Sequence, residues 1–443
     1  MKNEGGSADN SYVTWRRQDN WNPLTVTGAK DVSFYDENGK EYLDFSSQLM
    51  CVNLGHGNEN VINGIYEQLR TLPYVAPGFM TASRKKLSGL LKEILPDNQV
   101  KFFYATSGTE ANEAAVKITR MVKSMEGKTK IMSMYNSYHG STAASIGLTG
   151  DFRRIAVDSS ERVPGIVHVP QPYCYRCPFG LKYPSCGIAC AEYINYVARN
   201  EGNVGALILE PVTGTNGVIV PPDEYLPRIR EICDENGMFL IADEVMTGWG
   251  RTGKWFAVDN WNVKPDILTT AKGITSAYFP FSLTSTTAEI ADYFEEHFFA
   301  HGHTYEAHPL GMAASVSAIN EYKRLNLIER ARVLGKRLTE RLEEIKGRHR
   351  SVGDVRSIGL FAAIELVKNR ETKAPFNTYG EKIEGKPLLV DAISRACLEK
   401  GIYVSSWISH LIIAPPLIIS EEELDRGLSV IDSAISIADK EAD

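Results

Sequence analysis

The sequence predicts an α/β protein whose larger part is built on a parallel β-sheet and whose C-terminal part is a smaller α+β domain. Its 443 residues suggest two domains or one large α/β domain with an appendage. Strand and helix signals alternate along the chain, without repeats or low-complexity linkers. The last hundred residues instead mix short strands with helices, which is typical of a smaller α+β unit.

The clearest unit is a strand, a helix and a second strand. The segment VGALILEPV is an apolar run bounded by Gly and Pro, which predicts a strand covered on both faces. The following PDEYLPRIREICDENG places Leu226, Ile229 and Cys233 on one helical face and Gly237 where a C-terminal cap is expected. MFLIADEV is a second buried strand. Such a βαβ unit implies a parallel sheet.

Further elements follow the same signals. Strands are predicted in KIMSMYNSYHG, PDILTTAKG, LFAAIELV and GIYVS, and residues 311–346 are predicted to be helical.

Composition narrows the class of protein. Hydrophobic residues make up 43% and charged residues 23%, which is ordinary for a globular protein. The formal net charge of -7 gives no reason to expect nucleic-acid or membrane-surface binding. The start MKNEGGSADN has no apolar signal region, and no apolar run is long enough to cross a bilayer. We therefore expect a cytoplasmic protein with reduced thiols.

Three predicted strands end in an ionisable residue. Glu210 closes LILE, Asp243 closes FLIAD, and Lys272 follows DILTTA. Each alone is explained by helix capping or a surface salt bridge. Together they converge on the crevice at the carboxyl ends of the strands, where open α/β sheets bind ligands.

An anion site is predicted upstream. In FFYATSGTEANEAAVKITRM a strand runs into Ser107, Gly108 and Thr109 and then into a helix, which offers free backbone N–H groups and two hydroxyls. Many helices begin this way without a ligand, and the segment is neither a P-loop nor a GxGxxG fingerprint. Tyr138 and His139 follow the next strand and face the same crevice.

An anion site, a carboxylate, an amine and an aromatic ring together fit pyridoxal 5'-phosphate. The lysine can form a Schiff base with the cofactor aldehyde, and a carboxylate can keep the pyridine nitrogen protonated. A lysine in a confined site can have its amine activated and can later move a proton.

The blocks SGTEANEAAVKITR, SYHGST, LIADEVMTGWGRTG, TTAKGI, HTYEAHPLG and APPLII resemble the signature blocks of the class III pyridoxal-phosphate aminotransferases. The resemblance runs from about Trp15 to the C-terminus. It implies the aspartate-aminotransferase-like fold (fold type I), with a mainly parallel seven-stranded sheet and a small domain built from both chain ends. The implied division is an N-terminal segment at 1–60, a large cofactor-binding domain at 61–315 and a C-terminal small domain at 316–443.

The resemblance also implies site roles. Lys272 is the Schiff-base lysine and proton shuttle, and Asp243 pairs with the pyridine nitrogen. Tyr138 stacks on the ring, and these three form the expected catalytic set. Ser107, Gly108, Thr109, His139, Glu210, Val245 and Thr304 complete the expected cofactor site, with Thr304 reaching the phosphate of a neighbouring subunit. The family forms homodimers with shared active sites; whether dimers pair into tetramers stays open.

Two departures from the family bear on the substrate. The 4-aminobutyrate and ornithine branch has arginine where this chain has Ser141, and the ω-amine branch has arginine near Ser405, yet no arginine occurs from Gly401 to Pro416. Serine does not replace a guanidinium as a carboxylate partner. The expected pocket lining is apolar and aromatic: Leu49, Met50, Tyr74, Phe79, Tyr138 and Trp407, with Ser405 beside them.

The resemblance to the taurine, β-alanine and ω-amine:pyruvate type favours amines or ω-amino acids as donors and a 2-oxo acid, most simply pyruvate, as acceptor. The alternatives are a 2-oxoglutarate-dependent 4-aminobutyrate-type transaminase, or an aminomutase, decarboxylase or racemase on the same scaffold. A nicotinamide dehydrogenase is disfavoured because the glycine fingerprint is missing.

Four of the seven cysteines gather in YCYRCPFGLKYPSCGIAC. Cys174, Cys177, Cys186 and Cys190 have the spacing of a tetrahedral zinc site. The loop is short and transamination needs no metal, so we expect no metal and treat these as reduced structural thiols. The remaining alternative is a non-catalytic scaffold that uses the four cysteines to bind metal.

Overall fold

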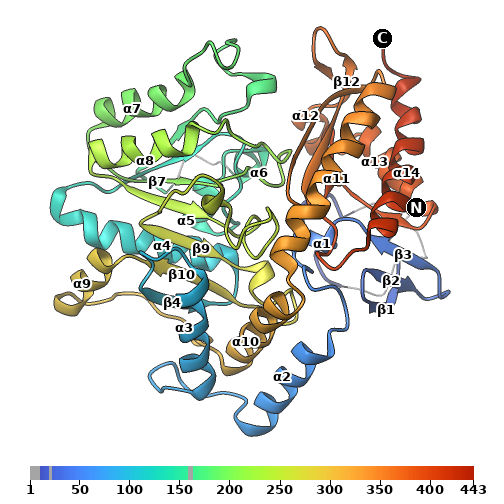
Figure 1. Cartoon of the computed structure of the whole chain (residues 1–443). Helices are drawn as coiled ribbons and strands as arrows, with labels where there is room; N and C mark the ends of the chain where they lie inside the picture. The colour runs from blue at the N-terminus through green and yellow to red at the C-terminus, as the bar shows by residue number, and fades with distance from the viewer. Residues whose placement is uncertain (1–9, 19–21, 158–162) are drawn as a thin grey trace.

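The computed structural model describes residues 10–18, 22–157 and 163–443. Within them the largest sheet has seven strands (Figure 1). In spatial order these are β4 (Lys101–Ala105), β10 (Ser282–Thr286), β9 (Ile267–Thr270), β8 (Phe239–Asp243), β7 (Val204–Leu209), β5 (Lys130–Met134) and β6 (Ile166–Val169). β10 runs antiparallel to its neighbours β4 and β9, and the other neighbouring pairs are parallel. The predicted mainly parallel seven-stranded sheet is confirmed.

Helices cover both faces of this sheet. Leu207 and Leu209 of β7 pack toward α7 (Ala189–Glu201) and α8 (Tyr225–Asn236). The alternate residues Ala206 and Ile208 pack toward α4 (Gly108–Lys123) and α5 (Ala143–Leu148). Successive side chains of a strand point to opposite faces, which explains why the strand is apolar without interruption. The predicted βαβ unit is confirmed, because β7 and β8 are parallel and α8 ends at Gly237 with a left-handed φ of +61°.

Two further sheets form the smaller part of the molecule. β1 (Val26–Lys30), β2 (Ser33–Asp36), β3 (Glu41–Asp44) and β14 (Ile402–Tyr403) make one sheet; β11 (Val352–Ile358), β12 (Phe361–Asn369), β16 (His410–Ile413) and β15 (Ser405–Trp407) make the other, with β13 (Ala374–Pro375) paired to β12. β14 lies parallel to β3, so segments near both chain ends share one sheet. The domain division at residues 60 and 315 stays a prediction.

The remaining helices surround these sheets. They are α1 (Ser47–Met50), α2 (Glu59–Thr71), α3 (Ala82–Ile94), α6 (Phe152–Val157), α9 (Ala288–Glu296), α10 (Pro309–Arg324), α11 (Leu327–Arg348), α12 (Tyr379–Ile383), α13 (Leu389–Glu399) and α14 (Glu421–Asp439). The helical stretch predicted over 311–346 is two helices, because Asn326 adopts a left-handed φ of +49° between α10 and α11. Figure 1 shows α14 on the same side of the molecule as β1 to β3.

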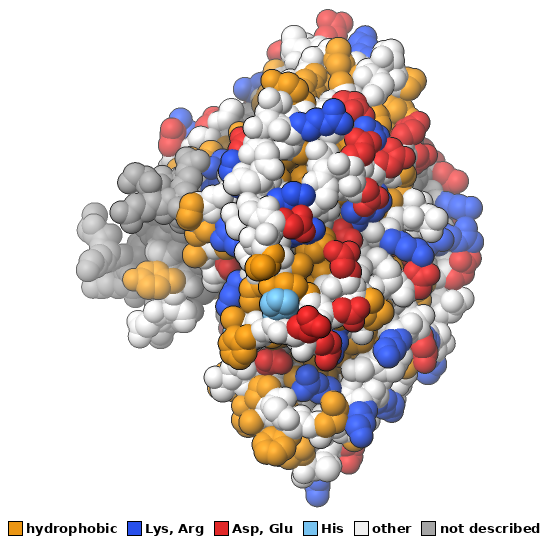
Figure 2. Space-filling view, turned by 90° about the vertical axis from the view of Figure 1, so that its left-hand side faces the viewer, with side chains coloured by type: hydrophobic (Ala, Val, Ile, Leu, Met, Phe, Trp, Pro, Cys, Tyr) orange, Lys and Arg blue, Asp and Glu red, His pale blue; other side chains and the backbone are white. Residues whose placement is uncertain are grey.

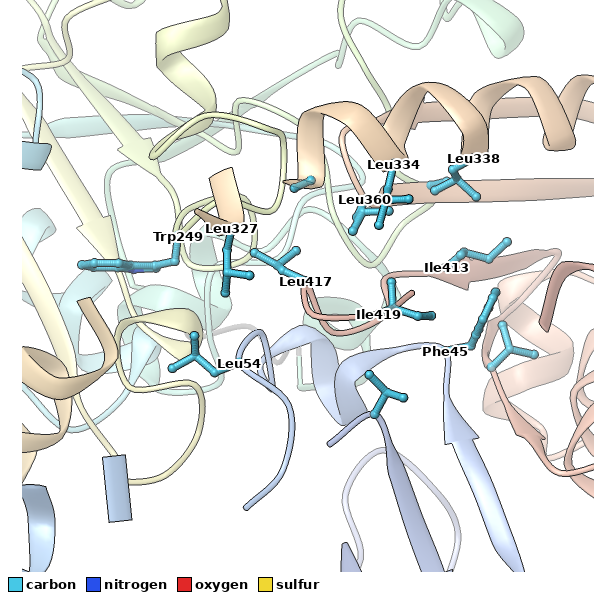
Figure 3. Packing of buried hydrophobic residues seen from close by; sticks show 14 of the residues in the cluster. Phe45, Leu54, Trp249, Leu327, Leu334, Leu338, Leu360, Ile413, Leu417 and Ile419 are labelled. Atoms are coloured by element: carbon cyan, nitrogen blue, oxygen red, sulfur yellow. The ribbon is translucent and has the colours of Figure 1, made fainter. Parts of the chain in front are cut away.

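One hydrophobic cluster extends from the large sheet into the smaller part (Figure 3). Trp249 is fully buried and donates its indole N–H to Thr270 Oγ1 of β9 at 2.7 Å. Leu327 of α11 and Leu417 lie beside it in the view, and Phe45 and Ile413 continue the cluster. This packing fixes the end of β9, directly before Lys272.

Side chains of both charge signs are interspersed on the face that Figure 2 shows. No helix in the described part of the chain has the length and apolarity needed to span a membrane. The expected cytoplasmic location stays a prediction.

Candidate functional site

The three strand-end residues meet as the sequence predicts. β7, β8 and β9 are neighbours in the sheet, so Glu210, Asp243 and Lys272 lie at the same edge. Removal from bulk water lowers the pKa of the Lys272 amine, while the charges of Asp243 and Glu210 oppose that shift. Lys272 is therefore a partly desolvated amine that faces two carboxyl groups, not a surface cation.

Asp243 is held by several donors. The side-chain amide of Asn112 donates to Asp243 Oδ2 at 2.7 Å, and His139 Nδ1 lies 2.8 Å from the same oxygen. The backbone N–H of Val245 donates to Oδ1 at 3.1 Å. Asp243 is 3% exposed, and within the described residues His139 Nε2 is buried without a partner. A buried, fixed carboxylate of this kind can hold a protonated ring nitrogen in one place.

The backbone at Lys272 is strained. Its φ is +49°, in the left-handed region that non-glycine residues rarely adopt. A Cβ on the next residue, Gly273, would lie 2.7 Å from Trp249 Cβ and 2.7 Å from Asn53 Nδ2. The segment therefore needs glycine after the lysine, and close packing holds the lysine in its strained conformation.

The predicted anion site lies at the start of α4. Ser107 caps the helix and forms a capping box with Glu110. Gly108 and Thr109 occupy the first helical positions, where backbone N–H groups have no partner within the helix. A cavity of about 280 Å³ separates this turn from the lysine. It is lined by Cys51, Thr106, Ser107, Gly108, Ala271, Lys272, Thr275, Ala277, Phe279, Pro280 and Phe281.

Gly108 also approaches the segment after Asp243. A Cβ on Gly108 would lie 2.9 Å from Val245 Cγ1, closer than side chains tolerate. The anion site and Val245, two residues after the buried carboxylate, are thus packed against each other.

Glu210 supports the segment that carries Tyr138. Its Oε1 accepts the backbone N–H of Tyr138 at 3.0 Å, and its Oε2 accepts that of Gly214 at 2.8 Å. Burial raises the pKa of the Glu210 carboxyl, and the nearby Asp243 charge acts in the same direction. On the Tyr138 ring itself lies the guanidinium of Arg153, 3.9 Å from the ring centroid.

Several expected pocket residues do not line the cavity beside Lys272, and their part in substrate binding stays a prediction. Met50 is 7% exposed and packs in a buried cluster with Val212 and Met246, because the left-handed turn at residues 47–50 directs it into the core. Leu49 is 69% exposed. Tyr74 donates its hydroxyl to the backbone oxygen of Thr304 at 2.7 Å. None of these residues, nor Phe79 or Ser405, is among those that line the Lys272 cavity.

Some site residues were missed at the sequence level. Asn112 lies in α4, one turn after Gly108. An asparagine this close to the predicted anion site was the available sequence signal. Cys51 lines the cavity. Arg153 comes from the short helix α6, which follows α5 in the chain, and nothing in its local pattern DFRRIA indicates that its guanidinium lies on the Tyr138 ring.

The four clustered cysteines surround one small cavity and are free thiols. Burial raises the pKa of Cys174 and, to about 11, that of Cys190. Among the residues that the structure describes, no group of three or more potential ligands is placed to hold a metal ion. The geometry gives the metal-binding alternative no support.

Together these features fit pyridoxal phosphate. Free amides at a helix start suit its phosphate, Asp243 suits its ring nitrogen, and Lys272 suits its aldehyde. A parallel α/β sheet with this site defines a fold type I pyridoxal-phosphate enzyme. Residues 14–435 match the family model "Aminotransferase class-III", and the chain belongs to the class III aminotransferase family, whose members depend on this cofactor.

Relatives of this chain are similar over nearly their whole length. A leucine/methionine racemase of Thermococcus litoralis is 36% identical to this chain, and the matched region spans 94% of this chain and 91% of the racemase. A taurine–pyruvate aminotransferase of Bilophila wadsworthia is 33% identical, with 98% and 97% covered. A solved taurine:2-oxoglutarate aminotransferase from Bifidobacterium kashiwanohense, in complex with PLP and glutamate, has a TM-score of 0.91 at 33% identity, with 97% and 96% covered.

Proposed function

We propose that this enzyme transfers an amino group from an ω-amino acid or amine of the taurine or β-alanine kind to a 2-oxo acid, with pyruvate as the preferred acceptor, in a ping-pong reaction. The observation that carries the donor class is the composition of the wall beside Tyr138. Strand β15 carries Ser405 and Trp407, Trp407 and Tyr138 both lie against the Arg153 guanidinium, and the sequence has no arginine from 401 to 416. A wall of this kind does not select a 2-amino dicarboxylate by a bidentate guanidinium from that segment.

Bound pyridoxal phosphate would supply an electrophilic carbon and a ring that accepts electrons. Lys272 would provide the nucleophilic amine and carry the proton between the donor carbon and the cofactor. Its lowered pKa favours this role because a larger fraction of the amine is neutral near neutral pH.

Asp243 would keep the ring nitrogen protonated, since Asn112 and His139 orient its carboxylate. Tyr138 would pack on one face of the ring and Val245 on the other. The amides of Gly108 and Thr109, with the Ser107 hydroxyl, would bind the phosphate at the positive end of the α4 dipole.

The relatives divide on acceptor and reaction. The Bilophila protein and a putrescine–pyruvate aminotransferase of Pseudomonas aeruginosa, 33% identical over 91% of this chain, are named for pyruvate, whereas the Bifidobacterium structure is named for 2-oxoglutarate. The racemase at 36% identity favours amino-acid racemisation as a second candidate. A racemase inverts its substrate without consuming an oxo acid, so the two reactions have different products.

We further propose a homodimer with shared sites. Thr304 is exposed and does not line the cavity of its own chain. Large exposed aromatic side chains lie beside it: Tyr305 is 59% exposed, and Tyr74, whose hydroxyl donates to the Thr304 backbone oxygen, is 40% exposed. A second copy of this chain docked on that face would bury these aromatic side chains and would bring Thr304 near the anion site of the partner subunit.

The test is a substrate panel with the purified holoenzyme. Taurine, β-alanine, putrescine, L-leucine and 4-aminobutyrate are each incubated with pyruvate or with 2-oxoglutarate, and L-alanine, L-glutamate and D-amino acids are quantified. We expect L-alanine from ω-amino donors. If L-glutamate were the only amino-acid product, 2-oxoglutarate and not pyruvate would be the acceptor. If D-leucine formed from L-leucine without consumption of an oxo acid, the enzyme would be a racemase and the proposal would be wrong.

A further inference from the structure

Arg153 lies in an aromatic cage at the edge of the site. Its Cζ atom is 3.9 Å from the ring centroid of Tyr138, 4.7 Å from that of Trp407 and 5.5 Å from that of Trp15. These aromatic residues come from three distant parts of the chain. Arg153 is 4% exposed and its charge acts on the Lys272 amine, so the guanidinium lies within electrostatic reach of the reacting lysine.

A hydrogen-bond chain fixes the guanidinium. Asp151 accepts from Arg153 Nε at 2.9 Å and from its Nη2, and also accepts the side-chain amide of Asn216 at 3.0 Å. Asn216 Oδ1 in turn accepts the indole N–H of Trp407 at 2.8 Å. One network therefore orients both the arginine and the tryptophan of the cage.

One edge of the guanidinium stays available. Arg153 uses Nε and Nη2 toward Asp151, and within the described residues its Nη1 donates no hydrogen bond. A guanidinium has five N–H donors in a planar fork and can serve two acids at once. Nη1 is not among the buried polar atoms that lack a partner, so within the described residues this edge of the guanidinium reaches solvent, and it is open to an anion that forms charge-assisted hydrogen bonds.

We propose that Arg153 binds the distal acid group of an ω-amino donor, a carboxylate or a sulfonate, while Trp407 and Trp15 pack against the carbon atoms that precede it. This inference rests on the proposed function. It explains how a chain without arginine at 141 or at 401–416 holds an acidic substrate. In this arrangement Arg153 of α6 binds the acid group of the donor. That contact favours donors of taurine or β-alanine shape over neutral amines, which lack the acid group.

The first arm of the test compares donors of similar size. For the holoenzyme, kcat/KM is measured for taurine, β-alanine and propylamine with pyruvate. The variants are Arg153→Met and the double variant Asp151→Asn with Arg153→Met, which leaves no uncompensated buried carboxylate. Arg395→Met, an exposed arginine on α13, is the matched control.

We expect the ratio of acid donor to propylamine to fall roughly 10- to 100-fold in both variants, which is the loss of one charge-assisted contact, and to stay unchanged in the control. A fall for taurine alone, or for β-alanine alone, identifies which acid the subsite serves. An unchanged ratio, or equal losses for all three donors, overturns the proposal.

The second arm is independent of catalysis. Binding of isethionate, a sulfonate without an amine, is measured by calorimetry on the same proteins. Saturable binding in wild type that is lost in both Arg153 variants supports the subsite even if no donor is turned over, in which case the proposed function alone fails. Equal binding in wild type and variants, or none in wild type, overturns the subsite while transamination of any donor still supports the function.

Discussion

His139 Nδ1 lies 2.8 Å from Asp243 Oδ2, and both side chains are buried. The histidine comes from the loop after β5 and the aspartate from the end of β8, so the contact links two parallel strands at the ligand-binding edge of the sheet. Asn112 of α4 donates to the same carboxylate oxygen. The acid that faces the cofactor site is thus fixed from the helix and from two strand ends.

Asp243→Asn should reduce kcat by about 1,000-fold or more, because an amide does not keep a pyridine nitrogen protonated. The measurement is steady-state transamination with saturating cofactor. Asp292→Asn, at an exposed position on α9, should retain full activity. An active Asp243→Asn enzyme would contradict the role of this carboxylate.

His139→Gln should lower kcat by roughly 10- to 100-fold, the loss of one hydrogen bond to a charged acceptor. It should also shift the pH at which the absorption spectrum of the bound cofactor titrates, since Asp243 loses a partner. The exposed His297→Gln serves as control. Reduced stability with an unmoved spectral titration would assign His139 a purely structural role.

Gly108→Ala should weaken cofactor binding about 10-fold, because the new Cβ would lie 2.9 Å from Val245 Cγ1 and must displace it at a cost of roughly 1 to 3 kcal/mol. Cofactor affinity is measured by titrating the apoenzyme. Adding Val245→Ala should restore part of the affinity. Gly89→Ala has open space around its Cβ and should change nothing; the same loss there would exclude a steric cause at Gly108.

Glu244 predicts a pH dependence of stability. Its carboxyl is fully buried after β8, accepts the backbone N–H of Val258 at 2.8 Å, and burial raises its pKa from 4.5 to about 7. Between those two pH values the folded state binds more protons than the unfolded state. Stability therefore falls as pH rises through this window, by about 3 kcal/mol for this group.

Glu244→Gln should accordingly be more stable, relative to wild type, at pH 8 than at pH 5. Urea midpoints at the two pH values give the comparison, with the exposed Glu289→Gln on α9 as control. An equal difference between wild type and Glu244→Gln at both pH values would show that Glu244 does not titrate there.

The structure explains which parts of the site could be predicted from sequence. Lys272 and Asp243 directly follow or end buried strands of a parallel sheet, so their meeting follows from local pattern and strand direction. Arg153, Asn216 and Trp407 come together only because α6, the loop after β7 and β15 fold onto one another. No local signal encodes such contacts. The burial of Met50 has no local signal for a similar reason, since its orientation depends on left-handed residues within its turn; its role in the substrate pocket stays a prediction.

We propose that Lys272 binds pyridoxal phosphate and that this chain transfers nitrogen from an ω-amino donor to an oxo acid. The most direct measurement is the near-visible absorption spectrum of wild type and Lys272→Ala, before and after taurine or β-alanine and then pyruvate are added. We predict that the lysine-bound cofactor band of wild type disappears with the donor and returns with pyruvate, and that Lys272→Ala shows neither change. A wild-type band that no amine alters, or the same reversible cycle in Lys272→Ala, would contradict the account.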